Sequence, residues 1–383
     1  PPNWVARLKK SYQIKLPDGY GAKIKYDSKA KGYYFRLSGP DGSQQFADRY
    51  KTIDDAAKHA ATLLHVRGLG KPKEAPKPQT SESKPRQRKQ AKTNQGNWHY
   101  KSVDFVSNGA KTKFNDNLEA LRTLRAVQLE DREATEAEKE AMSKFVGWGQ
   151  FPQVFDPGHR SGMYPQWRKE REELRAIIGD DAFKSASRAT TNSHFTAPDV
   201  IQAHWKMAER LGFKGGRMLE PAVGSGYYLG LMPEHIASKT NVTAIEMDQE
   251  SGALAKALYP SANVYITPFQ DHATPKDFFD LVATNVPFSE GIRIKYGSMR
   301  PTLHDYYFLR SIDTAKPGGL IMQLTSAGTM DKLDPRVRAK IEKECELVSA
   351  IRFPGDTHKD NAGTSVVTDM LILRKKNPSI PPA

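Results

Sequence analysis

The sequence is poor in cysteine and lacks long apolar runs, and each shortage excludes a class of protein. Among its 383 residues there is one cysteine, Cys345, which excludes a disulfide framework and a cysteine zinc site. The ten histidines show no paired spacing, so we expect no metal site. No stretch has the length of a transmembrane helix, and none has the pattern of a signal peptide. We therefore expect a cytoplasmic protein in a reducing compartment, without membrane contact.

Acidic residues are too few to balance the basic ones, and the excess lies near the N-terminus. The net charge is +14. Residues 1–68 hold 13 Lys and Arg against 6 Asp and Glu, and residues 71–92 hold 8 against 2. Such a concentrated basic region favours a polyanion such as nucleic acid. A solvated, solubilising arm is the alternative.

The first part of this basic region, residues 1–68, has the pattern of a small folded module. Residues 21–50 alternate apolar and polar side chains as three short strands do, and residues 52–64 predict a capped helix. The β-β-β-α order is similar to that of small DNA-binding modules that place a sheet in the major groove; a protein-docking domain fits equally. The candidate nucleic-acid contacts are Lys23, Lys25, Tyr34 and Arg36.

A proline-rich basic stretch separates this module from the rest of the chain. Residues 69–100 predict an extended linker, and residues 101–190 predict a helical extension. Within the extension, Thr135 and Glu138 form the pattern of a capping box. Residues 145–151, Phe-Val-Gly-Trp-Gly-Gln-Phe, predict a tight corner anchored by the tryptophan ring.

A short buried strand, predicted at residues 281–283, leads into Asn285, Val286, Pro287 and Phe288. Ligands of open α/β sheets lie beyond the carboxyl ends of the strands. An amide there can accept hydrogen bonds from an amino group, and a ring can stack on a base. The run resembles the Asn/Asp-Pro-Pro-Tyr/Phe catalytic loop of methyltransferases that modify exocyclic amino groups, with Val286 at the second position. An ordinary strand-to-loop turn is the alternative.

Further motifs in a fixed order make this resemblance more specific. They lie at residues 117–121, 132–135, 145–149, 191–196, 219–226, 285–288, 304–307, 328–332 and 362–364. In this order they resemble the methylase portions of adenine-specific DNA methylase–helicase proteins of phages and mobile elements, some linked to antirestriction. The resemblance covers residues 115–376. It implies a bacterial, phage or mobile-element origin and, for residues 191–383, an α/β Rossmann-like catalytic domain that uses S-adenosylmethionine. It also implies DNA as the substrate, adenine N6 as the target atom, and a helicase or specificity partner.

The predicted methyl-donor site begins at residues 219–226, Leu-Glu-Pro-Ala-Val-Gly-Ser-Gly. The run lacks the Gly-Lys-Ser/Thr ending of a P-loop, and Glu220 would repel a phosphate. A carboxylate there suits the amino group of S-adenosylmethionine, and two glycines permit close backbone approach. The residues of this turn assigned to the donor are Glu220, Pro221, Ala222, Gly224 and Gly226.

A second carboxylate follows at the end of the next predicted strand, about twenty residues after the glycine turn. Glu246 there can bridge ribose hydroxyls, and Asp248 is the weaker candidate. Met247, between them, is assigned to the same site.

Two aromatic residues complete the predicted donor site. Phe269 or Gln270 can contact the donor adenine, although the family usually has Glu where Gln270 stands. Phe195 and Thr196 resemble a motif in which an aromatic ring lies near the donor adenine and a hydroxyl meets its carboxylate. A role for Phe195 in the core is the alternative.

The predicted chemistry is a direct displacement at the sulfonium methyl group. The Asn285 side-chain oxygen and the backbone carbonyl of Val286 or Pro287 can accept the two amino hydrogens, which aims the nitrogen lone pair at the methyl group. Phe288 can stack on a base that has left its duplex. Asn285 therefore borders both donor and base. Cys345 lies in a charged run, which does not favour methylation of cytosine at carbon 5.

The C-terminal part predicts three more strands, at residues 320–325, 347–352 and 366–373, with an antiparallel edge as in this methyltransferase class. Asp305 is either the N-cap of a helix or a contact to donor or base.

Other functions remain open from the sequence. The loop motif also serves methylases of cytosine N4, of RNA bases and of protein glutamine, and an inactive DNA-binding antirestriction scaffold is a further alternative. Arg293, Lys295 and Arg300 in the loop at residues 289–303 can hold the backbone beside a flipped base. That loop and the nine residues after Arg374 are too short for a recognition domain, so we expect relaxed sequence specificity.

Overall fold

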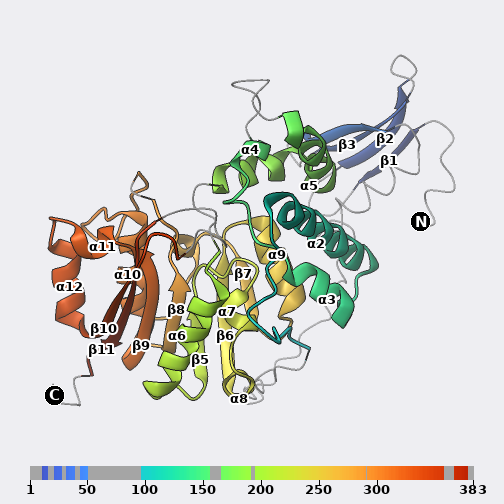
Figure 1. The fold of residues 1–383 in the computed structure, drawn as a ribbon. Helices are drawn as coiled ribbons and strands as arrows, with labels where there is room; N and C mark the ends of the chain where they lie inside the picture. The colour runs from blue at the N-terminus through green and yellow to red at the C-terminus, as the bar shows by residue number, and fades with distance from the viewer. Residues whose placement is uncertain are drawn as a thin grey trace, which may run out of the picture. The chain divides into compact units, whose positions relative to one another are not determined.

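The computed structural model describes residues 11–15, 21–27, 32–38, 44–50, 96–155, 165–190, 195–289, 291–357 and 366–377. The chain divides into two compact units, Pro1–Arg88 and Lys89–Ala383. Figure 1 shows the elements of both units.

The first unit contains a four-stranded antiparallel sheet in the order β1-β2-β3-β4. Its strands are β1 (Ser11–Lys15), β2 (Gly21–Asp27), β3 (Gly32–Ser38) and β4 (Gln44–Tyr50). Three of them match the predicted strands, whereas β1 was not predicted. Lys23 pairs with Arg36 and Lys25 with Tyr34, so the four candidate nucleic-acid contacts occupy paired positions on neighbouring strands. The predicted helix at residues 52–64 lies outside the described residues.

The second unit is built on a seven-stranded sheet in the order β10-β11-β9-β8-β5-β6-β7. Its strands are β5 (Gly216–Glu220), β6 (Thr240–Glu246), β7 (Asn263–Ile266), β8 (Phe279–Asn285), β9 (Ala315–Ser326), β10 (Cys345–Phe353) and β11 (Thr368–Lys375). The strands from β9 to β7 pair in parallel, and β11 runs antiparallel to both of its neighbours. The predicted Rossmann-like sheet with an antiparallel edge is confirmed.

Both faces of this sheet are buried, as expected for parallel strands. Consecutive residues alternate between two core clusters: Met218 and Leu281 lie in one, and Leu219 and Val282 in the other. Helix α6 (Pro198–Arg210) precedes β5, and the helices between the later strands are α7 (Tyr227–Gly230), α8 (Glu234–Ala237), α9 (Gln249–Leu258), α10 (Leu303–Thr314), α11 (Gly328–Asp331) and α12 (Arg336–Glu344). The carboxyl ends of β5, β6, β8 and β9 therefore meet along one edge of the sheet.

A helical extension precedes the sheet and packs against α9 (Figure 1). It comprises α2 (Ala110–Glu130), α3 (Glu136–Ser143), α4 (Pro152–Phe155), the 3-10 turn η3 (Pro165–Trp167) and α5 (Arg168–Ala189). The capping box of Thr135 and Glu138 is present at the start of α3, as predicted. Arg125 of α2 forms an ion pair of 2.6 Å with the buried Glu250 of α9.

Residues 96–100, which the sequence assigned to the linker, instead pack on this unit. Trp98 donates its backbone N–H to Leu258 at 2.9 Å, and Tyr100 donates its own to Gly230 at 3.0 Å. The Tyr100 ring stacks on Phe105. The tryptophan and tyrosine rings supply the apolar surface that packs these residues on the unit. Their polar neighbours are typical of a linker, which explains the prediction.

Candidate active site

The glycine turn between β5 and α7 is folded as tightly as its sequence predicts. Gly224 and Gly226 have φ of 57° and 98°, in the left-handed region that favours glycine. A Cβ on Gly226 would lie 2.2 Å from the Tyr259 ring, and one on Gly224 would lie 3.2 Å from the Phe195 ring. No other residue fits at these two positions without displacing a ring.

Glu220, the last residue of β5, is a buried carboxyl group beside this turn. It is 1% exposed, and neither of its oxygens makes a hydrogen bond of ordinary geometry to a described residue. Burial raises its pKa well above the usual range, and the negative charge of Glu246 adds to this; the Thr284 hydroxyl and the Ala222 backbone amide oppose the shift. Such a group favours a cationic ligand, because a positive charge would stabilise its ionised form.

Glu246, at the end of β6, is held in place by two backbone amides. Its Oε2 accepts a hydrogen bond from Gly224 N at 2.8 Å, and its Oε1 accepts one from Asp248 N at 2.7 Å. Burial and the charge of Asp248 raise its pKa to about 7. Asp248 itself caps α9 by accepting from Ser251 N, so of the two candidates Glu246 is the one oriented by the glycine turn.

The other predicted donor contacts differ in how they are placed. Phe195 is half-buried on Gly224 and lies edge-on to Tyr227, with 5.0 Å between ring centroids; Thr196 beside it is buried. Met247 is 69% exposed next to Glu246. Phe269 is 1% exposed and packs against Tyr307 in the core, so Gln270 is the residue of that pair with a side chain at the surface.

The Asn-Val-Pro-Phe loop begins where β8 ends. Asn285 pairs with Leu324 of β9, and Val286 continues the pairing by donating its N–H to Leu324 O at 2.9 Å. The Val286 side chain is 1% exposed in the core, whereas Pro287 and Phe288 are half-buried. A proline at position 286 could not make this hydrogen bond, so the valine fixes the loop to the sheet.

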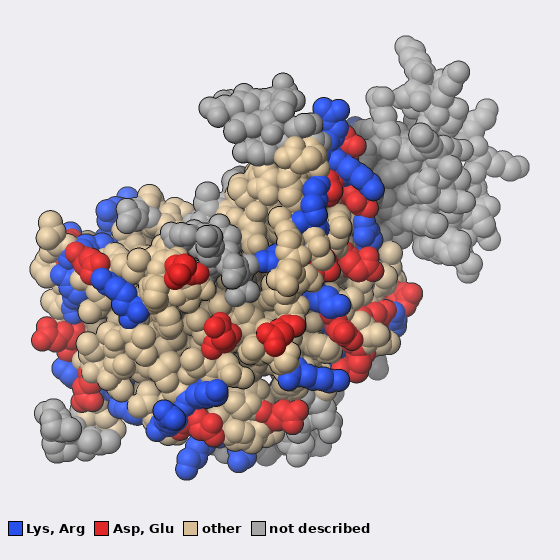
Figure 2. All heavy atoms as spheres, in the orientation of Figure 1, with Lys and Arg blue, Asp and Glu red and all other residues tan. Residues whose placement is uncertain are grey.

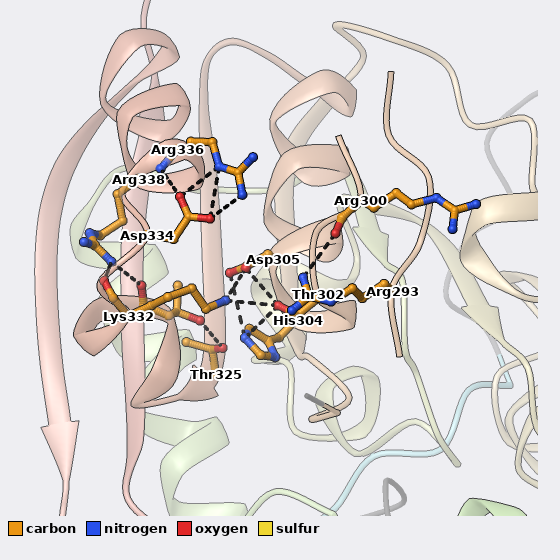
Figure 3. A network of polar contacts seen from close by, with 11 residues as sticks. Arg293, Arg300, Thr302, His304, Asp305, Thr325, Lys332, Asp334, Arg336 and Arg338 are labelled. Atoms are coloured by element: carbon orange, nitrogen blue, oxygen red, sulfur yellow. Dashed lines mark hydrogen bonds and ion pairs between the residues drawn. The ribbon is translucent and has the colours of Figure 1, made fainter. Parts of the chain in front are cut away.

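A buried polar network, which we call the rim network, lies on the same edge of the sheet (Figure 3). It consists of Thr302, His304, Asp305 and Lys332. The Thr302 hydroxyl donates to Asp305 Oδ2 at 2.8 Å and lies 3.0 Å from His304 Nε2, and Lys332 forms an ion pair with Asp305. Asp305 is 3% exposed.

The N-cap of α10 is Thr302, so the N-cap interpretation of Asp305 is wrong. Asp305 stands in the first helical turn, and its carboxylate joins the residues before α10 to Lys332 after α11. The sequence could not show this, because the two motifs lie 27 residues apart.

The segment between the catalytic loop and α10 is a β-hairpin, which sequence reasoning treated as a loop. Tyr296 and Met299 exchange backbone hydrogen bonds of 3.0 and 2.9 Å across a turn at Gly297, and Ile294 N donates to Pro301 O at 3.1 Å. The Tyr296 hydroxyl donates to Asp313 of α10 at 2.8 Å, which anchors the hairpin.

The predicted nucleic-acid contacts Arg293, Lys295 and Arg300 are all exposed on this hairpin. None of the three forms an ion pair with a described residue, and in Figure 3 the Arg300 side chain points away from the rim network. The remaining predicted contacts belong to the first unit.

A wall of the glycine turn comes from the helical extension, which sequence reasoning missed. The Phe145 carbonyl accepts hydrogen bonds from Tyr227 OH at 3.1 Å and Ser225 Oγ at 3.4 Å. Asn117 of α2, fully buried, fixes the following turn: its side chain accepts from Val146 N and donates to Gly147 O, both at 2.8 Å. The spacing of the Asn117 and Phe-Val-Gly-Trp-Gly motifs in the chain gives no sign of this contact.

Cys345 is buried, and burial raises the pKa of its thiol to about 12, so it is a poor nucleophile. The described residues contain no group of three or more His, Cys, Asp or Glu side chains that could hold a metal ion. Within the same residues, no helix combines the length and apolarity needed to span a membrane.

Comparison with known proteins relates this chain to an antirestriction protein. No protein-family model matches it. The chain is a homologue of the Defense against restriction protein B of Escherichia phage P1, with 29% identity over 212 residues. The match covers 53% of this chain and 9% of the phage protein, so the chain corresponds to a small part of that relative.

Similar solved structures include the methyltransferase subunit of a type I restriction-modification system from Streptococcus thermophilus. Its TM-score is 0.44 at 15% identity, and the match covers 72% of this chain and 68% of that one. A Listeria monocytogenes protein assigned to the class I S-adenosylmethionine-dependent methyltransferases has a TM-score of 0.42 at 15% identity, covering 72% of this chain and 91% of that one. Similarities at this level do not bear on function, which has to be argued from the site.

Proposed function

We propose that this protein transfers a methyl group from S-adenosylmethionine to the exocyclic amino group of adenine in DNA. The observation that carries the proposal is the meeting, at one edge of the sheet, of a glycine turn with two carboxyl groups and an Asn-Val-Pro-Phe loop. Ligands of open α/β sheets bind at this edge. The homology to the phage P1 protein agrees with a role in protection from restriction.

The residues of the glycine turn fit S-adenosylmethionine. The donor carries a cationic amino group, which Glu220 can hold because its buried oxygens lack ordinary hydrogen bonds. Glu246, oriented by Gly224 N and Asp248 N, can accept hydrogen bonds from ribose hydroxyls. When bound, the donor supplies an electrophilic methyl group on a positively charged sulfur.

The chain's own part in the chemistry is orientation rather than covalent catalysis. The Asn285 side-chain oxygen and a carbonyl of the following peptide accept the two amino hydrogens of the base, which directs the nitrogen lone pair at the methyl group. The Val286–Leu324 hydrogen bond keeps these acceptors still. Phe288 is half-buried at the end of the loop, where its ring can stack on an extruded base.

DNA is the proposed substrate because of the cations around this site. Arg293, Lys295 and Arg300 lie on the hairpin beside the loop, and residues 291–303 contain no acidic residue. Side chains of this kind bind phosphates, which position a duplex without specifying its sequence. We therefore propose adenine methylation in many sequence contexts, with a helicase or specificity subunit as a candidate partner.

Transfer of labelled methyl groups tests the proposal against its alternatives. Purified protein and labelled donor are incubated separately with duplex DNA, RNA and a glutamine-containing protein, and incorporation is counted. We expect label in DNA, and none with Asn285→Ala. Label in RNA or protein alone would contradict the substrate, and donor binding without transfer to any acceptor would favour an inactive scaffold.

A further inference from the structure

The rim network joins the two chain segments that flank the catalytic loop. The hairpin follows the loop in sequence and leads into Thr302, whereas Lys332 follows α11 at the end of β9, the strand that pairs with β8. Lys332 Nζ contacts both the Thr302 hydroxyl, at 3.2 Å, and the Asp305 carboxylate. Asp305 and Thr302 are buried, whereas the Lys332 side chain is 28% exposed, so the network connects the two flanks with its lysine end open to solvent (Figure 3).

The corner between α11 and α12 is held by polar contacts of its own. The Thr325 and Thr329 hydroxyls lie 2.8 Å apart at its base, and Arg338 of α12 donates to the Lys332 carbonyl. Asp334 and Arg336 pair at 2.6 Å on its outer side. Over α12 the Lys and Arg side chains lie beside Asp and Glu, so the corner's charges are largely balanced (Figure 2).

At the tip of this corner, Leu333 is 97% exposed, more than any other large apolar residue that the structure describes. Single exposed leucines are common and need no explanation by themselves. Leu333 differs in its place, because it directly follows Lys332 of the rim network, on the corner that continues from the end of β9, the strand paired with β8. On the other flank, Ile292 of the hairpin is 44% exposed next to the exposed Arg293.

We propose that Leu333 enters the base stack of duplex DNA when the target adenine leaves it. This inference rests on the proposed function. A base must be extruded to reach a pocket at the end of β8, and the gap it leaves has apolar walls. Proteins that distort DNA fill such gaps with apolar side chains, leucine among them. A corner held by several polar contacts suits the role, because ordering a less restrained segment on insertion would cost more entropy.

The test compares Leu333→Ala with wild type on two forms of one DNA sequence. Transfer is measured on the duplex and on the single strand, and extrusion is followed separately by the fluorescence of 2-aminopurine placed at the adenine position. We expect Leu333→Ala to lower transfer to duplex by about tenfold or more, while single-strand transfer stays within about twofold. The fluorescence rise on duplex binding should shrink in parallel, and Leu333→Met should restore both.

Leu129→Ala is the matched control, since Leu129 is also an exposed leucine, at 55%, but lies on α2. It should leave duplex transfer and fluorescence unchanged. Equal losses of Leu333→Ala on duplex and single strand, or no loss on either, would overturn the inference while leaving the proposed function intact. If wild type transfers no methyl group to DNA, the proposed function fails and this inference fails with it.

Discussion

At the scale of single residues, the proposed catalytic loop depends on one amide and one hydrogen bond. Asn285 stands at the strand end where an amine would lie, while Val286 ties the loop to β9. We predict that Asn285→Ala abolishes methyl transfer but leaves donor affinity within a few-fold, because Glu220 and Glu246 are untouched. Single-turnover transfer and calorimetric titration measure the two effects separately, with Thr284→Ser as a neighbouring control. Transfer close to the wild-type rate would exclude Asn285 from the chemistry.

The second prediction at this scale concerns pH. Glu246 has a pKa raised to about 7 from its usual 4.5, so near pH 6 it is largely protonated in the free protein. Ribose hydroxyls donate to the carboxylate form, so binding must release the proton. Donor affinity should therefore rise between about pH 5.5 and 7 and then level off, less steeply in Glu246→Gln. Titrations in buffers of different ionisation enthalpy count the protons released.

The raised pKa of Glu246 also makes the stability of the folded protein depend on pH. The protonated acid is the favoured folded form, so its contribution is fully present below pH 4.5 and is lost as the pH rises through about 7. The charge of Asp248 contributes to the raised pKa of Glu246, and the charge of Glu246 in turn raises the pKa of Glu220. A donor affinity independent of pH over this range would contradict the role given to Glu246.

At the scale of elements, the helical extension supports the donor site through one turn. Asn117 makes both hydrogen bonds that fix the turn at Val146 and Gly147, and the neighbouring Phe145 carbonyl receives Ser225 and Tyr227. We predict that Asn117→Ala lowers the free energy of unfolding by roughly 1–3 kcal/mol. It should also weaken donor binding several-fold, because the backing of the glycine turn is lost.

Val127→Ala is the control for that variant. Val127 is buried on the same helix, and its truncation costs a comparable amount of stability without touching the turn. Denaturant unfolding and donor titration of both variants are compared. If the two weaken donor binding equally, the effect comes from general destabilisation and the specific role of the turn is disproved.

Elements with strong local patterns were predictable from the sequence, and those made by distant contacts were not. The strands of the seven-stranded sheet, the antiparallel edge and the capping box at Thr135 follow from apolar runs and short motifs. The hairpin at residues 292–303 was missed although residues 292–296, Ile-Arg-Ile-Lys-Tyr, alternate apolar and basic side chains. Asn117 bonds the backbone of Val146 and Gly147, and Asp305 pairs with Lys332; these partners lie tens of residues away, so no local pattern reveals them.

At the scale of the whole molecule, the excess of basic residues and the proposed site residues lie in different units of the chain. Residues 1–88 hold 19 Lys and Arg against 8 Asp and Glu, whereas the donor and loop residues all lie in the second unit. We predict that removing residues 1–88 weakens DNA binding and flattens its salt dependence, since log affinity falls by about 0.9 per log salt for each phosphate contact. Donor binding should be spared.

The truncated protein must keep Gly96 and the residues after it, because Trp98 and Tyr100 pack on the second unit. Affinities of both proteins for one duplex, measured over a range of salt concentrations, give the two slopes. Identical slopes would show that the basic region does not touch phosphates.

Nucleoside analysis tests the proposed methylation of adenine N6 in DNA. Unmethylated duplex DNA is incubated with the protein and donor carrying a heavy-isotope methyl group, then digested to nucleosides and analysed by mass spectrometry. We expect labelled N6-methyl-2′-deoxyadenosine, and none when the protein carries Asn285→Ala. Label in N4-methylcytosine, or no labelled nucleoside from a protein that binds the donor, would contradict it.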